Sequence, residues 1–245
     1  MTRIAGLVFS GLGFALVHVI FIYIIVWLSD IVPSHSIRAH TDTPISKALA
    51  TNLLLVVLFA LQHSGMARNS FKKFTSRFVH LAFERSVYVW SAVLALTCLI
   101  WFFEPIPITV WKTEYVLLQV LIWTAFACGW AISFAAYLSV GIKFLLGLSQ
   151  CFAWFRSEPL PEQALVESYI YKWVRNPQQL GLLIAFWSTP HMTVGQLIFA
   201  FLLTVYIFVG VKLEERDLHK LHGKSFVSYK KSVPAIIPWK FKSWS

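Results

Sequence analysis

A series of long apolar stretches separated by short polar segments constrains this chain more than any other feature. Six stretches are read along it: residues 4–28, 48–61, 88–103, 116–140, 180–187 and 194–211. The longest reach the ~20 residues that a helix needs to cross a hydrocarbon core of ~30 Å. Charged residues make up only 13% of the chain, against about 25% in soluble domains. The sequence therefore predicts an all-α, polytopic integral membrane bundle of about five to six transmembrane helices, with residues 1–245 forming one domain.

The N-terminal stretch could be mistaken for a secretory signal. Its apolar part is too long for such a signal, and no small-residue cleavage site precedes Asp30. We expect it to be retained as an anchor. Cys98, Cys128 and Cys151 have neither paired spacing nor an even count, so the sequence predicts no disulfide and no bound metal.

The net charge of +10 lies in the segments that flank the apolar stretches, which argues against nucleic acid as a partner. The loop after the second stretch carries Arg68, Lys72, Lys73, Arg77 and Arg85, whereas the loop after the third carries Glu104, Lys112 and Glu114. Other basic residues adjoin the last two stretches: Lys143, Arg156, Lys172, Arg175, Lys212, Arg216, Lys220, Lys224, Lys230, Lys231, Lys240 and Lys242. Because basic loops stay in the cytoplasm, we expect six crossings with both termini inside.

The last two apolar stretches are close together in the sequence. Only Ser188, Thr189, Pro190, His191 and their neighbours separate them, and no charged residue occurs between Gln179 and Lys212. This pattern predicts a C-terminal helical hairpin immersed in the membrane, with Pro190 at its turn.

One polar cluster, residues 171–181, leads into this hairpin. If the approach is helical, Tyr171 and Arg175 share a face. Asn176 and Pro177 form a good N-cap and first-turn pair. Two interpretations stay open: a capped helix break with Arg175 reaching lipid phosphate, or a receptor for a carboxylate or phosphate made by the arginine and a helix N-terminus.

A second polar cluster follows the last stretch, at residues 212–217 and 221–229. Charged side chains at a helix exit are often only its solvated end. Glu214 and Glu215 are adjacent carboxylates at the edge of the bilayer, however, so we expect at least one to have a cationic partner or a raised pKa.

Elsewhere, His63 ends the second stretch, where a lone histidine is more often an interfacial residue than a base. The sequence contains no phosphate loop, dinucleotide fingerprint or nucleophile elbow.

Taken in order, these motifs resemble the membrane methyltransferases related to isoprenylcysteine carboxyl methyltransferase, and more closely the nurim family, which includes bacterial methanethiol S-methyltransferases. The resemblance runs from the second stretch to the C-terminus. It is carried by residues 62–68, 84–89, 104–107, 171–181, 182–190, 214–218 and 222–229. At two positions of the family's Arg-His-Pro-x-Tyr-x-Gly pattern, this chain has Asn176 and Gln179. It keeps the paired glutamates that the animal nurims lack, which favours an enzyme.

The resemblance implies S-adenosylmethionine-dependent methyl transfer to a small thiol, with methanethiol giving dimethyl sulfide, and a cofactor region at about residues 140–245. It implies a multi-pass protein of the bacterial inner membrane with the active site facing the cytoplasm, and a small thiol and membrane lipid as partners. The candidate catalytic residues are Arg175, Glu215 and His63, with His222 as a second possible base. The candidate cofactor-binding residues are Tyr171, Arg175, Asn176, Glu214, Glu215 and Tyr229.

Within this interpretation, Arg175 and the start of the hairpin would receive the cofactor carboxylate. Glu214 and Glu215 would face its ammonium group or ribose, and Tyr171 and Tyr229 would line its adenosine or sulfonium. The alternatives are a non-catalytic nurim-like membrane scaffold and a methyltransferase for an isoprenoid thiol or lipid. A small transporter has little support, because the stretches contain almost no charge and no inverted repeat.

Overall fold

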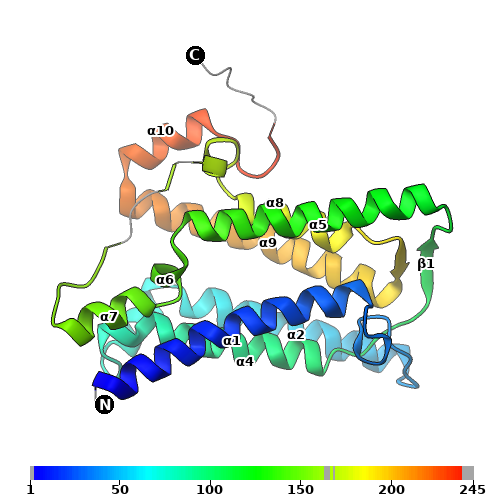
Figure 1. Cartoon of the computed structure of the whole chain (residues 1–245), viewed down its shortest axis with the longest axis horizontal. Coiled ribbons are helices and arrows are strands. Elements are labelled where there is room, and N and C mark those ends of the chain that lie inside the picture. Colours follow the sequence, from blue (N-terminus) through cyan, green and yellow to red (C-terminus); the bar gives the residue numbers. More distant parts are fainter. Residues whose placement is uncertain (1–2, 163–165, 168, 239–245) are drawn as a thin grey trace. The chain divides into compact units, whose positions relative to one another are not determined.

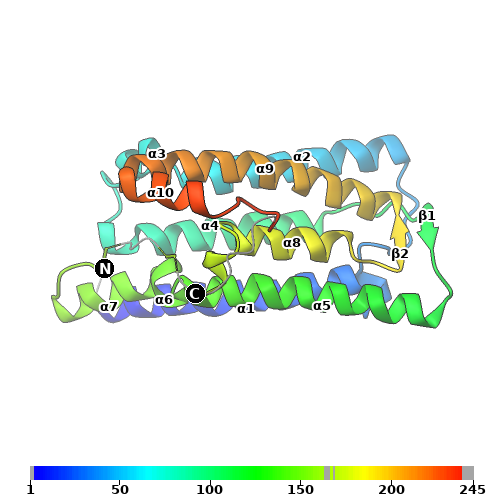
Figure 2. The same ribbon diagram turned by 90° about the horizontal axis from the view of Figure 1, so that it is seen from above.

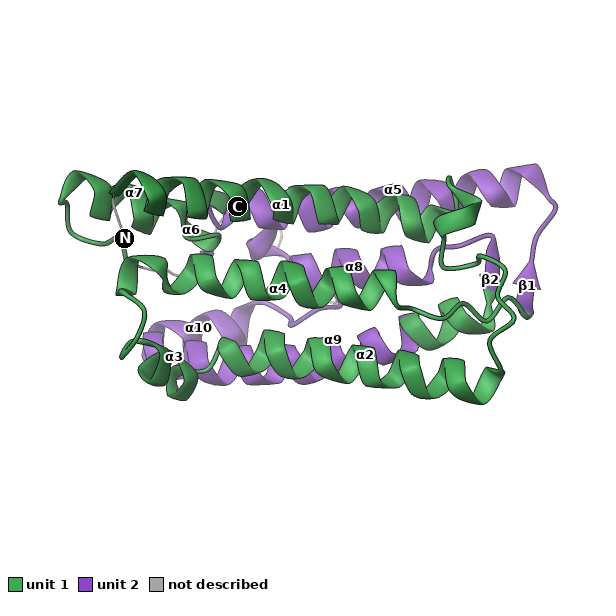
Figure 3. Ribbon diagram, turned by 90° about the horizontal axis from the view of Figure 1, so that it is seen from below, with its two compact units in different colours: residues 1–108, 142–162, 193–199 green, residues 109–141, 163–192, 200–245 purple. Residues whose placement is uncertain are grey.

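The computed structural model describes residues 3–162, 166–167 and 169–238, so Lys240 and Lys242 of the predicted basic tail lie outside the described residues. The chain forms two compact units whose segments alternate along the sequence (Figure 3). Unit 1 contains residues 1–108, 142–162 and 193–199, and unit 2 contains residues 109–141, 163–192 and 200–245. The prediction of one domain over residues 1–245 stays a prediction.

Five helices of the described chain are long and apolar enough to cross a membrane. They are α1 (Arg3–Ser29), α2 (Ile45–Met66), α4 (Glu84–Trp101), α5 (Val116–Ser139) and α9 (Val194–His222), and the 3-10 turn η2 (Leu81–Phe83) leads into α4. These helices confirm the predicted all-α integral membrane fold of five to six spans. The orientation of these helices across the membrane stays a prediction.

In unit 1, α4 packs against both α1 and α2 (Figure 1). Lipid is as apolar as leucine, so helices in a membrane associate through close packing and polar contacts rather than by hydrophobic burial. The hydroxyls of Ser10 and Ser86 accordingly lie 2.7 Å apart in the α1–α4 interface. Trp90 donates its indole N–H to the Phe9 carbonyl at 3.0 Å and packs against Gly13, where a β-carbon would leave no room.

Short helices lie at one end of unit 1. Helix α3 (Asn69–Thr75) follows α2, and α6 (Ile142–Leu145) and α7 (Leu148–Arg156) follow α5. Helix α7 packs on α1 and on η2, where Cys151 joins a buried cluster with Ala82 and Phe83.

At the other end of unit 1, after the 3-10 turn η1 (Pro33–His35), Arg38 pairs with Asp30 at 3.2 Å and donates to Gln196 at 2.9 Å. The side chain of the buried Asn52 donates to the backbone carbonyl of Glu104 and accepts from its backbone N–H, each at 2.8 Å. These contacts satisfy the buried polar groups of Arg38 and Asn52.

In unit 2, α5 packs along α8 (Pro177–Trp187) (Figure 2). The two helices cross at Gly129 and Gly181, with Ser133 beside them, so their backbones touch directly. Helix α8 is the fifth predicted apolar stretch. Its 11 residues extend over about 16 Å, which is too short to cross the hydrocarbon core alone.

The turn between α8 and α9 contains one strand of a two-stranded sheet, which the sequence does not predict. Strand β1 (Thr109–Lys112) pairs with β2 (His191–Thr193). Beside it, Thr113 donates its backbone N–H to the Pro190 carbonyl at 3.0 Å, and the Trp111 indole donates to the Thr189 carbonyl at 3.1 Å. These bonds fix the predicted Pro190 turn.

Beyond the last turns of α9, the chain reverses at Gly223, whose φ of +53° favours glycine. Helix α10 (Lys224–Ser232) then folds back beside the end of α9 (Figure 1). The 3-10 turn η3 (Tyr169–Lys172) approaches α8. It ends before Arg175, so Tyr171 and Arg175 do not share a helical face.

We predict that Gly181→Val lowers the melting temperature of the detergent-solubilised protein, corresponding to a loss of about 1–3 kcal/mol. A β-carbon at residue 181 would overlap the Gly129 carbonyl and the Ser133 amide, which are backbone atoms of the facing helix. Gly210→Val is the matched control, because nothing lies within 4 Å of a β-carbon there. Equal melting temperatures for the two variants would contradict the direct backbone contact.

Candidate functional site

The candidate site is built where the segment before α8 meets the C-terminal tail of unit 2. The backbone N–H of Arg175 donates to the Pro234 carbonyl at 2.9 Å, and that of Asn176 donates to the Ala235 carbonyl at 3.0 Å. The Asn176 side chain also donates to the Ala235 carbonyl, at 3.1 Å. Asn176 is the N-cap residue of α8 and Pro177 the first helical residue, as predicted, but the asparagine side chain binds the tail instead of capping the helix.

An ionic cluster ties this junction to the end of α9. Arg175 donates from Nε and Nη2 to one oxygen of Glu215, at 2.9 and 2.6 Å, and Lys230 donates to the other oxygen at 2.8 Å. The Nη1 group of Arg175 donates to the Lys230 carbonyl at 3.2 Å and to the Val233 carbonyl. The expectation that one of the paired glutamates has a cationic partner is therefore confirmed for Glu215, which has two.

Burial makes the arginine–glutamate pair the stronger half of this cluster. The side chains of Arg175 and Glu215 are 7% and 11% exposed, whereas that of Lys230 is 55% exposed. A buried charge that loses its partner costs about 3–5 kcal/mol, whereas an exposed pair contributes about 1 kcal/mol or less. The four hydrogen bonds from Arg175 also use most of the five N–H donors of its guanidinium group. Arg175 thus connects the segment before α8 with α9, through Glu215, and with α10 and the tail, through the carbonyls of Lys230 and Val233.

Two tyrosines adjoin the cluster. Tyr229 on α10 donates its hydroxyl to the backbone carbonyl of Tyr171 at 2.6 Å. Burial raises the pKa of Tyr171 above its usual value, and the negative charge of Glu214 raises it further. Burial also raises the pKa of Tyr229. Both phenols therefore remain neutral throughout the physiological range.

The candidate residues from the sequence fall into three groups. Tyr171, Arg175, Asn176, Glu215 and Tyr229 come together at the junction just described. Glu214 directly precedes Glu215 on α9. Its side chain is exposed, and its negative charge raises the pKa of Tyr171. His63 belongs to α2 of unit 1, so it is described separately.

The sequence analysis missed the parts of the junction that the C-terminal tail supplies. Lys230 is 15 residues beyond its partner Glu215, and no spacing rule links two residues across the reversal at Gly223. The other partners are the backbone carbonyls of Val233, Pro234 and Ala235. Every residue type has such a carbonyl, so the sequence does not indicate which of them accept hydrogen bonds. The amphipathic pattern of residues 224–232 is the one signal that could have shown that this segment packs against another element.

The candidate bases have different surroundings. The His63 ring lies 3.0 Å from the Tyr88 hydroxyl and stacks on Phe59, with ring centroids 5.4 Å apart. The Nε2 atom of His222 is buried with no hydrogen-bond partner in the described part of the chain. Among the described residues, no three His, Cys, Asp or Glu side chains are arranged to hold a metal ion.

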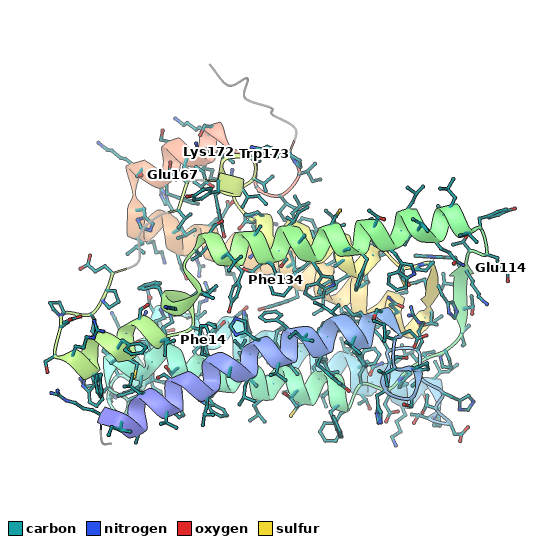
Figure 4. The ribbon with its side chains drawn as sticks, in the orientation of Figure 1. Phe14, Glu114, Phe134, Glu167, Lys172 and Trp173 are labelled. Carbon is teal, nitrogen blue, oxygen red and sulfur yellow. The ribbon has the colours of Figure 1, made fainter. Side chains whose placement is uncertain are left out.

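Two hollows lie in unit 2. A groove of about 540 Å³ runs between the end of α9 and α10, and its lining residues are Lys212, Glu215, Arg216, His219, Phe226, Val227, Lys230 and Lys231. A smaller apolar hollow of about 320 Å³ lies at the other end of α8, beside Trp111 and Trp187. Figure 4 shows Lys172 and Trp173 beside α10, with Glu114 at the opposite end of α5.

Comparison with known proteins now adds to this geometry. The phospholipid methyltransferase family model matches residues 117–225. Methanethiol S-methyltransferase 2 of Bradyrhizobium diazoefficiens is 39% identical over 96% of this chain and 91% of its own length. Methanethiol S-methyltransferase of Mycobacterium tuberculosis is 35% identical over 98% of each chain. Human nurim is 30% identical over 77% of this chain and 74% of its own length.

The chain belongs to the nurim family. The similarity to other members of the nurim family extends over nearly the whole chain and includes both units. The match to the phospholipid methyltransferase model is narrower. It contains Arg175, Glu214 and Glu215 but ends before Tyr229 and Lys230. No solved structure matches the chain significantly.

We predict that Arg175→Gln and Glu215→Gln each destabilise the protein by about 3–5 kcal/mol, because each leaves a buried charged group with a lost partner. The double variant should be less destabilised than the sum of the two single variants, since it removes both charges together. Thermal unfolding of the four proteins in detergent measures this coupling. Additive effects would mean that the two side chains do not interact. Lys230→Gln serves as the exposed comparison and should cost about 1 kcal/mol or less.

Proposed function

We propose that this protein is an S-adenosylmethionine-dependent thiol S-methyltransferase that converts methanethiol to dimethyl sulfide. The observation that carries the proposal is the similarity to two methanethiol S-methyltransferases over nearly the full length of the chain. When bound, S-adenosylmethionine supplies the methyl group: a bond from this carbon to the acceptor sulfur forms, the bond to the sulfonium breaks, and the thiol proton is released.

The exposed carboxylate and the two neutral phenols suit a ligand with positive groups. Glu214 is exposed at the end of α9, and its charge reaches Tyr171. In our proposal Glu214 accepts hydrogen bonds from the ammonium group or ribose hydroxyls of the cofactor. Tyr171 and Tyr229 lie against its adenosine or sulfonium, because a neutral aromatic face attracts a cation.

Arg175 and Glu215 take a positioning role in this proposal. They neutralise each other, and their hydrogen bonds hold the start of α8 against the C-terminal tail. Because the Asn176 side chain binds Ala235, the first turn of α8 keeps backbone donors that no capping side chain occupies. These donors would receive the cofactor carboxylate, while Arg175 holds the segment that presents them.

The acceptor thiol and its proton require a different environment. Methanethiol is small and apolar enough to arrive through the lipid, so its route needs no aqueous channel. His63 is our candidate for the base that takes the thiol proton, because the Tyr88 hydroxyl lies within hydrogen-bond distance of its ring and can orient it. We further propose that the protein resides in a bacterial inner membrane with this site facing the cytoplasm, as the basic loops suggest.

A non-catalytic scaffold is the second candidate, favoured by the similarity to human nurim. An isoprenoid thiol or a lipid would be alternative acceptors, and the match to the phospholipid methyltransferase model favours the lipid. Incubating membranes that contain the protein with labelled S-adenosylmethionine and a panel of acceptors separates these candidates. We expect labelled dimethyl sulfide in the headspace only when methanethiol is supplied. Binding of the cofactor without any transfer to methanethiol would reject the proposed acceptor, and no cofactor binding would favour the scaffold.

For the cofactor site, we predict that Glu214→Gln weakens S-adenosylmethionine binding by about tenfold or more, since a hydrogen bond to a charged group contributes about 1.5–3 kcal/mol. Calorimetry on the protein in detergent measures the affinity. Glu114→Gln is the control, because Glu114 is also exposed and lies at the far end of α5 (Figure 4). An unchanged affinity in the Glu214 variant would remove Glu214 from the site.

For the base, we predict that His63→Gln lowers the turnover of methanethiol by about 10²–10⁴-fold while cofactor affinity stays the same. The lost activity should partly return in alkaline buffer, where more of the thiol ionises unaided. A histidine with a purely structural role would give no such recovery. His35→Gln, which changes an exposed histidine of the same unit, should leave turnover unchanged.

A further inference from the structure

The groove between α9 and α10 has a strongly basic lining that the methyl transfer does not require. Among the described residues, four permanent cations line it, and Glu215 is the one carboxylate in that lining. That carboxylate already holds Arg175 and Lys230, at 2.6 and 2.8 Å. Arg216 lies 3.9 Å from the carboxylate of Asp217, but both side chains are partly exposed, and such a pair contributes little. Lys212 and Lys231 therefore leave an excess of positive charge in the groove.

The helices place these side chains on two facing surfaces. Lys212, Arg216 and His219 recur at the spacing of one helical face on α9. Val227, Lys230 and Lys231 form the corresponding face of α10, where the aliphatic surface of Val227 lies beside the amines. Phe226 lies behind this face, 2% exposed and packed against Tyr229 and Val233. A ligand for this groove would combine an anionic group with an apolar portion.

The depth of the groove in the membrane follows from the length of α9. This helix has 29 residues and extends over about 43 Å, against a hydrocarbon core of ~30 Å. Its apolar part, residues 194–211, accounts for about 27 Å. Residues from Lys212 onward therefore emerge into the headgroup layer, where phospholipid phosphates lie.

From this charge, this lining and this depth we infer that the groove between α9 and α10 binds the headgroup of an anionic phospholipid. The phosphate pairs with Arg216 and Lys231, and Val227 contacts the glycerol and upper acyl carbons. Because Lys230 also holds Glu215, a bound lipid would keep α10 against α9 and so stabilise the junction around Arg175. The inference does not depend on the proposed methyl transfer.

The test uses the full-length protein, purified and stripped of lipid in a neutral detergent. Phosphatidylglycerol, phosphatidylcholine and inorganic phosphate are titrated separately while the melting temperature is recorded, and native mass spectrometry counts retained lipid. We expect phosphatidylglycerol to raise the melting temperature at concentrations where the other two have no effect. A response to inorganic phosphate alone would identify a soluble phosphate as the occupant and overturn the lipid assignment.

A pair of charge-matched variants locates the binding. Arg216→Gln with Lys231→Gln should weaken phosphatidylglycerol binding by roughly tenfold or more, since each basic group near a membrane surface contributes about 1 kcal/mol. Lys220→Gln with Lys224→Gln removes the same charge from exposed positions outside the groove and should leave the affinity within about twofold of the original. Equal losses in both double variants would mean that lipid responds only to overall charge, and the groove would not be a site. Cofactor binding is measured in parallel, so a failure of the lipid site is distinguishable from a failure of the methyltransferase proposal.

Discussion

The carboxylate of Glu215 is the interaction on which the arrangement of the candidate site depends. Its two oxygens accept hydrogen bonds from Arg175, which precedes α9 in the chain, and from Lys230, which follows α9. A carboxylate at the edge of the bilayer is costly to bury without partners, so the two cations and the glutamate require one another. Through this one group, the segment before α8, the last turns of α9 and the returning α10 become a single structure.

Helix packing in both units follows the rules that apply when lipid replaces water. Small residues let backbones touch, as Gly129 and Gly181 do between α5 and α8. Hydroxyl pairs such as Ser10 and Ser86 supply specific contacts that apolar side chains cannot. The clamp of Asn52 on Glu104 has the same character, since both backbone groups of Glu104 are satisfied by one side chain. These are features of a protein whose polar atoms bind each other because no solvent is available to them.

The sequence predicted the membrane helices and several members of the site, for reasons that are local. Apolar runs identify spans directly, and the Asn-Pro pair identified the start of α8. Arg175, Glu215 and Tyr229 lie in the two polar clusters beside the last apolar stretches, and the resemblance to a known family suggested their roles. The partners contributed by the tail could not be found this way. Lys230 reaches Glu215 only after the chain reverses at Gly223, and backbone carbonyls of residues 233–235 leave no trace in a pattern of side chains. The sequence analysis also counted the stretch of α8 as one of six crossings. The polar residues ahead of it form a 3-10 turn and do not lengthen the helix, so α8 is too short to be a crossing by itself.

The short α8 has a consequence for the C-terminal tail. A helix of 11 residues leaves the backbone ahead of it non-helical, so the N–H groups of that backbone need acceptors elsewhere in the protein. The carbonyls of Pro234 and Ala235 are those acceptors. The tail is thus a component of the membrane fold and not an appendage to it. Affinity tags or fusion partners should be attached beyond residue 238, and a shortened version of the chain that stops before Pro234 would leave the entrance to α8 open.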